Sequence, residues 1–140
     1  MSTEQNKALV RRLVDASVAS DQAALKELLA PDFVAYQTYG TQDREAFLQH
    51  LNGFLVAFSD NHFTVEEQVA EGDKVVTRTT WHATHSSDFQ GLPPTGKQIA
   101  ISGITIERIK DGKIVERWAS YDMMGLMQQL GVVPPPQPAR

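Results

Sequence analysis

Asp111 and Gly112 constrain the fold of this chain more than any other pair of residues. An Asp-Gly pair between two runs of alternating hydrophobic residues is the strongest short-range signal for a β-hairpin. The run before the pair covers residues 98–109, and the run after it begins at Lys113. The sequence therefore predicts two long antiparallel strands near its C-terminal end.

The strand after this turn ends in a carboxylate. Read with period two from Ile114, it places Trp118 and Asp122 on one face and Ala119 and Tyr121 on the other. Asp122 also precedes a helical pattern, and aspartate is a preferred N-cap. We consider two compatible roles for Asp122: a helix cap, and a carboxyl group beside an indole whose pKa is raised by burial.

Helical patterns occupy the beginning of the chain. Ser2 and Gln5 have the spacing of a capping box, and the apolar periodicity that follows predicts an amphipathic helix over residues 3–19. A second, shorter helix and a third one beginning near Asp43 come next. Gly53 lies inside the third helix, where glycine costs about 1 kcal/mol relative to alanine. We therefore expect close packing at Gly53.

The second half of the chain is predicted to be mostly strands. Residues 62–69 and 74–85 alternate and are rich in valine and threonine. The loop over residues 86–96 is long for a hairpin, which is typical of functional rims. Because the isoleucines of the strand over residues 98–109 fall on both faces, we expect a bulge near Gly103 that reverses the alternation.

Helices first and antiparallel strands second predict an α+β fold. We expect a curved antiparallel sheet that wraps the N-terminal helices into a cone, with a plug or a ligand in the wide end. Residues 1–131 are predicted to form a single domain, and residues 132–140 a proline-rich tail.

Composition narrows the classes of function. The 140 residues are 41% hydrophobic and 21% charged, as in ordinary globular proteins. A net charge of −4 without a cluster of lysine and arginine argues against a nucleic-acid partner. The absence of cysteine removes disulfides and thiolate chemistry. No signal peptide or membrane span is apparent, so we expect a cytoplasmic protein without a membrane partner.

Histidine and arginine side chains supply the remaining candidates for chemistry. His85, at a strand end before the long loop, is a candidate pocket residue, although strand-end histidines are often only hydrogen-bonded. His82 and His85 point to opposite strand faces, so no metal site is predicted. His50 is expected at the surface. Arg78 and Arg108 lie in mid-strand and are either solvated or paired with a carboxylate.

The chain contains several short sequence motifs that are informative as a set. They are PDFV at 31–34, TH at 84–85, GLPPTGK at 91–97, SGITI at 102–106, DGKI at 111–114, and W-x-x-x-D at 118–122 followed by LxQQLG. With these words the chain closely resembles the SnoaL-like polyketide cyclase family, also called ester cyclases, of the NTF2-like cone fold. The resemblance covers nearly the whole chain.

The resemblance implies cofactor-free ring closure by intramolecular aldol condensation of a small polyketide-like or aromatic ligand. Asp122 matches the position of the family's general acid/base. His85 is a second catalytic candidate. The residues expected to bind substrate are Trp118, Tyr36, Phe33, Trp81, Tyr121 and Arg108. Aromatic walls of this kind stack against flat ring systems.

Two alternatives remain open. The domain could be a non-catalytic module for small-molecule binding or dimerisation. It could also be a hydrolase or dehydratase of the same cone fold, with Asp122 paired to Arg78, Arg108 or His85.

The expected facing of the last strand also bears on assembly. With Val115, Ala119 and Tyr121 pointing outward, the sheet would expose an apolar patch, and a homodimer would cover it.

Overall fold

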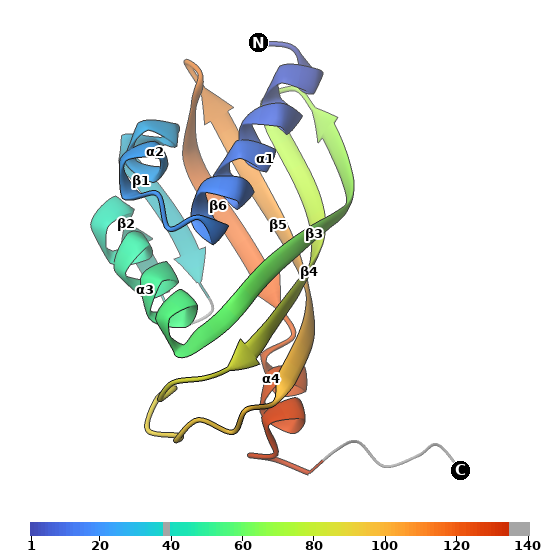
Figure 1. The fold of residues 1–140 in the computed structure, drawn as a ribbon. Helices are drawn as coiled ribbons and strands as arrows, with labels where there is room; N and C mark the ends of the chain where they lie inside the picture. The colour runs from blue at the N-terminus through green and yellow to red at the C-terminus, as the bar shows by residue number, and fades with distance from the viewer. Residues whose placement is uncertain (38–39, 135–140) are drawn as a thin grey trace.

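The computed structural model describes residues 1–37 and 40–134, in which four helices accompany a six-stranded sheet (Figure 1). The helices are α1 (Thr3–Val18), α2 (Gln22–Leu28), α3 (Arg44–Ala57) and α4 (Met123–Leu130). The strands are β1 (Leu29–Gln37), β2 (Gly40–Asp43), β3 (Phe58–Glu71), β4 (Lys74–His85), β5 (Gln98–Lys110) and β6 (Lys113–Tyr121). The predicted α+β class is confirmed, and β2 is an element that sequence analysis missed.

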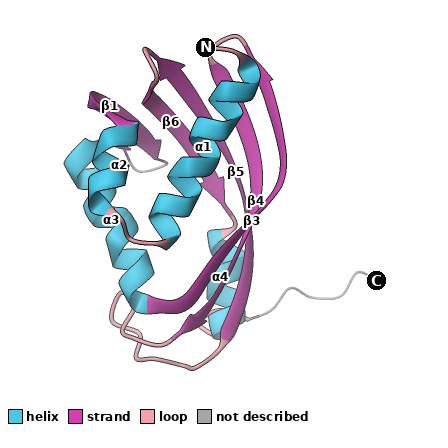
Figure 2. Cartoon of the chain, turned by 45° about the horizontal axis from the view of Figure 1, so that its top comes forward, coloured by secondary structure: helices cyan, strands magenta, loops and turns pink. Residues whose placement is uncertain are grey.

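The strands follow the order β2-β1-β6-β5-β4-β3 across one curved sheet. Figure 2 shows α1, α2 and α3 on the same side of this sheet. Neighbouring strands are antiparallel with one exception, because β1 runs parallel to β6. The expectation of a purely antiparallel sheet was therefore wrong at this pair. Within the described residues, no helix combines the length and the apolar character that a membrane span needs.

Local sequence signals explain the ends of the elements. The Gln5 amide donates to the Ser2 hydroxyl at 3.1 Å and the Gln5 side chain accepts from the Ser2 amide at 2.8 Å, which completes the capping box of α1. Asp111 and Gly112 both adopt positive φ, as the tight turn between β5 and β6 requires. Gly131 ends α4 in the left-handed conformation. These predictions are confirmed.

Two hydrophobic clusters fill the concave side of the sheet. The first joins the inner faces of α1 and α2 to the sheet and includes Leu13, Phe33 and Ile114. The second lies toward α4 and includes Trp81 and Leu126. The candidate functional site takes lining residues from both clusters, such as Phe47 from the first and Trp81 from the second.

Strand β5 alternates without interruption. It pairs with β4 in continuous register, with Gly103 on the inner face and Ile104 outward and 49% exposed. The predicted bulge at Gly103 was therefore wrong. Gly103 instead leaves room for Tyr121, since a Cβ built there would lie 2.2 Å from Cδ1 of the Tyr121 ring. Close approach of a neighbouring side chain is a recurrent reason for glycine in a strand.

The irregularity lies in the pairing of β5 with β6. Ile109 pairs with Ile114 but Arg108 pairs with Glu116, so Val115 is the extra residue of a β-bulge. After the bulge, the residues of β6 that point inward are those that would point outward if the alternation continued without a break. The predicted facing was therefore wrong from residue 116 onward.

This correction removes the basis on which a dimer was expected. Ala119 and Tyr121 do not point outward, because both line the interior cavity described below. The outer face of the sheet exposes Val76 and Ile104 instead, at 37% and 49%. The homodimer stays a prediction. Most of the predicted tail over residues 132–140 lies outside the described residues.

The contact at Gly103 leads to a stability prediction. A Gly103→Ala substitution forces the Tyr121 ring to move, and overpacking of this kind costs about 1–3 kcal/mol. Urea denaturation followed by tryptophan fluorescence measures the change in the free energy of unfolding.

Gly53→Ala provides the matched control. A Cβ at Gly53 meets nothing within 4 Å, contrary to the close packing that the sequence led us to expect. Because Gly53 lies within α3, alanine should stabilise the protein by up to about 1 kcal/mol. Equal effects of the two alanines would contradict the proposed contact at Gly103.

Candidate functional site

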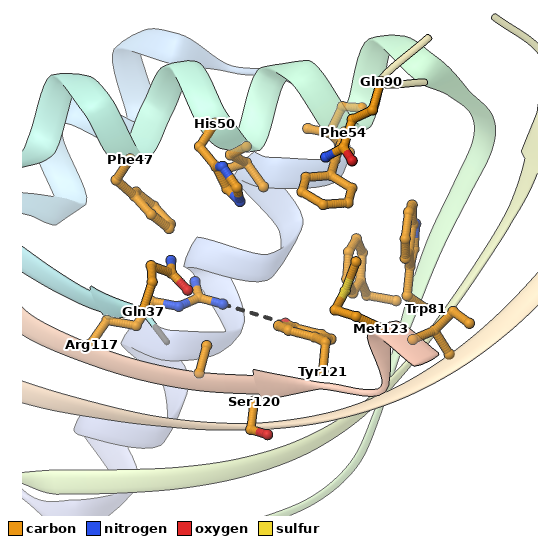
Figure 3. Close-up of a pocket in the computed structure, with 15 residues that line it drawn as sticks. Gln37, Phe47, His50, Phe54, Trp81, Gln90, Arg117, Ser120, Tyr121 and Met123 are labelled. Atoms are coloured by element: carbon orange, nitrogen blue, oxygen red, sulfur yellow. Dashed lines mark hydrogen bonds between the residues drawn. The ribbon is translucent and has the colours of Figure 1, made fainter. Parts of the chain in front are cut away.

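A cavity of about 270 Å³ lies between α3 and the inner face of the sheet (Figure 3). Most of its wall is apolar or aromatic, and it is contributed by α3, α4, five of the strands and the loop before β5. The lining residues described by the structure are Gln37, Phe47, His50, Leu51, Phe54, Leu55, Phe63, Trp81, Gln90, Ile101, Arg117, Ala119, Ser120, Tyr121 and Met123. Concave, largely apolar sites with a few polar groups are typical of small-molecule pockets.

Arg117 supplies the positive charge of this cavity. Because β6 is reversed after Val115, its guanidinium points inward and lies over the Phe47 ring, 5.1 Å from the centroid. Its Nη2 donates to the Tyr121 hydroxyl at 3.3 Å. Within the described part of the chain, stacking on an aromatic face and one hydrogen bond hold the guanidinium, which carries further N–H groups that a ligand could accept.

A buried carboxyl group lies behind Arg117. Glu107, on the neighbouring strand β5, is 1% exposed, and its Oε2 lies 3.7 Å from Nε of Arg117. This separation is an ion-pair distance and is too long for a hydrogen bond, so this buried Nε has no hydrogen-bond partner within the described residues. The Thr105 hydroxyl donates to Glu107 at 2.9 Å.

Burial is the main influence on Glu107. It raises the pKa of the carboxyl group, while Arg117 and the Thr105 hydrogen bond lower it less strongly. Glu107 lines a separate cavity of about 40 Å³ that shares Arg117 and Tyr121 with the larger one. Glu107 is not among the described residues that line the main cavity, and its ion pair with Arg117 connects it to that cavity.

His50 extends from α3 into the opposite wall of the cavity. Figure 3 shows its ring between Phe47 and Phe54, above Arg117 and Tyr121 of β6. The rings of His50 and Phe54 meet edge to face, with centroids 5.1 Å apart. Burial lowers the pKa of His50, and the charge of Arg117 lowers it further. The neutral imidazole is thus favoured.

The structure separates the residues that sequence analysis assigned to substrate binding. Trp81 and Tyr121 line the cavity, but Phe33 is buried in the other cluster against Phe47, with centroids 5.2 Å apart. Tyr36 and Trp118 stack on each other at 5.1 Å and are not among the lining residues.

Arg108 belongs to the same outer group. The Tyr36 hydroxyl donates to Glu116 at 2.7 Å, and Arg108 forms an ion pair with the same carboxylate. The hydrogen bond from Tyr36, followed by that from Arg108, lowers the pKa of Glu116. Glu116 therefore keeps its charge and is satisfied by its neighbours, which is typical of a structural ion pair.

His85 lies at the base of the long loop and outside the cavity lining. It is fully buried, its Nδ1 accepts from the Thr95 amide at 3.2 Å, and the Thr95 hydroxyl lies 3.0 Å from the same nitrogen. Accepting the amide hydrogen assigns the ring proton to Nε2. This geometry fastens the loop to β4, and Gln90 of that loop reaches the cavity.

Asp122 caps α4. Its Oδ1 accepts from the Gly125 amide at 2.8 Å, and the residue is exposed. Its neighbours Tyr121 and Met123 line the cavity, whereas Asp122 does not. The role of Asp122 as a helix cap is therefore confirmed by the geometry.

Sequence analysis missed His50, Arg117 and Gln37 as lining residues. His50 is one position away from the apolar stripe of α3, which in a packed core would place it outside. Arg117 follows the bulge at Val115, for which no glycine or proline provides a signal. Gln37 ends β1, and its neighbours in the sheet could not be inferred because the pairing with β6 is distant in sequence.

Comparisons with known proteins agree with the fold and cover most of the chain. The family described as SnoaL-like polyketide cyclase matches residues 7–130. DauD, an aklanonic acid methyl ester cyclase from Streptomyces sp. (strain C5), is 31% identical over 129 residues, which cover 88% of this chain and 80% of DauD.

Two solved structures are also similar. AclR from Streptomyces galilaeus, described as a candidate hydroxylase, superimposes with a TM-score of 0.88 at 32% identity, covering 95% of this chain and all of AclR (100%). IdmH from Streptomyces antibioticus, described as a candidate polyketide cyclase, gives a TM-score of 0.82 at 33% identity, covering 91% of this chain and 99% of IdmH. The chain therefore belongs to the SnoaL-like polyketide cyclase family.

Proposed function

We propose that this protein closes a ring in a polyketide-like methyl ester by an intramolecular aldol reaction. Family membership and the name of DauD support the reaction class. The observation that carries the proposal is the Arg117–Tyr121 pair in the wall of an otherwise largely apolar cavity. Such a pair offers N–H and O–H donors to the oxygen that becomes an enolate.

The lining favours a flat, unsaturated substrate. Phe47, Phe54, Phe63 and Trp81 provide aromatic faces and edges, which contact flat ring systems well. The volume of about 270 Å³ is slightly below the usual range for ligand pockets, so a polycyclic ester would extend past the rim.

The chemistry requires only proton transfers and a stabilised oxyanion. Removing a proton next to a carbonyl places negative charge on that oxygen, which a guanidinium in a low-dielectric cavity stabilises strongly. The enolate carbon then attacks a second carbonyl of the same molecule. The product is an isomer of the substrate, so the proposed reaction requires no oxidant, reductant or co-substrate.

Proton transfer was assigned to Asp122 on the basis of the family resemblance. Asp122 is an exposed residue, its carboxylate accepts a hydrogen bond from the Gly125 amide, and it is not among the described residues that line the cavity. We therefore propose that Asp122 acts as the cap of α4 and that a group inside the cavity carries the proton.

Incubation of the protein with aklanonic acid methyl ester, followed by chromatography and mass spectrometry, tests the proposed activity. We expect a new product of unchanged mass. A product with one additional oxygen atom would favour a hydroxylase, as the likeness to AclR suggests, and would overturn the proposal. Binding without conversion would favour the non-catalytic module and would overturn it as well.

Arg117→Lys tests the oxyanion site. Lysine keeps the positive charge near Glu107 but loses the planar donors, and loss of one such donor group typically lowers kcat about 10²–10³-fold. Steady-state kinetics with the methyl ester should show the loss mainly in kcat.

Arg78→Lys is the matched control, because Arg78 is also a mid-strand arginine but pairs with Glu67 at 2.7 Å on the exposed outer face. It should leave kcat unchanged. If both lysine variants retained the parental rate while remaining folded, Arg117 would not stabilise the reacting oxygen.

Substitutions of Asp122 give a prediction in which stability and activity change independently. Asp122→Asn preserves a good N-cap and should retain both stability and kcat, whereas Asp122→Ala should lose about 0.5–2 kcal/mol of unfolding free energy. Thermal denaturation and steady-state kinetics measure the two effects. A folded Asp122→Asn variant with at least about 10²-fold lower kcat would restore Asp122 as the acid/base.

A further inference from the structure

We propose that His50 is the base that removes the substrate proton and later returns it to the product oxygen. The inference rests on the proposed ring closure and names the proton carrier for it. His50 lines the same cavity as Arg117 and Tyr121 but comes from α3, on the opposite wall (Figure 3). A substrate held between these walls would present its enolising carbonyl to one and its acidic C–H bond to the other.

The other titratable groups fit this task less well. No carboxylate is among the described residues that line the main cavity. Glu107 lines the smaller cavity and pairs with Arg117, and His85 is buried and hydrogen-bonded to Thr95 of the loop. Asp122 points to the first turn of α4. Among the described residues on the cavity wall, His50 is the group that can accept a proton near neutral pH.

The surroundings of His50 keep its imidazole in the basic form. Among the described lining residues, the charged and titratable groups across the cavity from His50 are Arg117 and Tyr121 of β6, and Gln37 of β1 and Gln90 of the loop add polar groups. Partial burial and the Arg117 charge both lower the pKa of His50. A base must be unprotonated to act, and a lowered pKa provides this at neutral pH.

The proposed steps balance. A ring nitrogen of His50 takes the proton from the carbon next to the carbonyl, and the C–H electron pair forms the enolate, whose oxygen lies against Arg117 and Tyr121. The enolate carbon bonds to the second carbonyl carbon, and the π electrons of that carbonyl move to its oxygen. The resulting alkoxide takes the proton back from the imidazolium, which yields a hydroxyl group and regenerates neutral His50.

His50→Gln tests the proposal, because glutamine keeps the polarity and approximate size of the side chain but cannot act as a base. With the methyl ester used above, we expect kcat to fall about 10²-fold or more with little change in KM. The matched control is His62→Gln on β3, since His62 is outside the cavity lining and packs near His82, with ring centroids 6.3 Å apart. The control should keep the parental rate.

The pH profile separates this role from a purely structural one. The kcat/KM of the parent should fall toward acid pH with an apparent pKa below that of ordinary histidine, and the residual activity of His50→Gln should lack this limb. An unchanged acid limb in a folded His50→Gln variant would overturn the inference while leaving ring closure itself intact. Failure of the parent to close the ring would instead overturn the proposed function.

A titration of the parent requires no variant. Imidazole nitrogen shifts measured by NMR between pH 4 and 8 should show His50 neutral at pH 7, with a pKa below the ordinary value of about 6.5. A His50 that is protonated at pH 7 could not serve as the base, and this result would overturn the proposal even if His50→Gln failed to fold.

Discussion

The bulge at Val115 determines which side chains face the interior of this fold. Without it, β6 would continue the alternation that buries Ile114 and would turn Trp118 inward. With it, the inward face after Ile114 passes to Arg117, Ala119 and Tyr121. One extra residue therefore exchanges an indole for a guanidinium at the centre of the cavity. Bulges are common next to active sites because they redirect side chains in this way.

A guanidinium at this depth needs compensation for the water it loses. The Phe47 ring, the Tyr121 hydroxyl and the Glu107 carboxyl group surround it at 5.1, 3.3 and 3.7 Å. None of these contacts is a bidentate ion pair, and burial favours the neutral form of Glu107. The described residues around Arg117 consequently neutralise its positive charge only in part. An anion that forms on a ligand beside it would complete the compensation.

The sequence was sufficient to predict the four helices, most of the strands and the α+β class, although it missed β2. Capping residues, the turn at Asp111 and Gly112, and the C-cap at Gly131 are local signals, and each of them determines local geometry. The words shared with the family gave the cone fold. The capping and turn features depend on residues that are close together in the chain, so periodicity and turn chemistry reveal them.

The residues that line the cavity were harder to predict from the sequence. A bulge without glycine leaves no mark in the pattern, so Trp118 and Asp122 were expected where Arg117 and Tyr121 are found. His50 was predicted to lie at the surface, but it lines the cavity. A helix that packs beside a cavity can direct into it a side chain that a fully packed core would not accommodate. The parallel pairing of β1 with β6 joins segments about 80 residues apart, as the register of Tyr36 with Trp118 shows, and no local pattern predicts it.

That parallel pairing has a consequence for how a ligand reaches the cavity. Strand β6 is held by hydrogen bonds along both edges, to β1 and to β5, whereas α3 follows β2 at the margin of the sheet. Elements with fewer buried apolar contacts open at a lower free-energy cost than core strands do. We therefore expect entry of a large ligand to displace α3. Strand β6 should keep its position throughout a turnover.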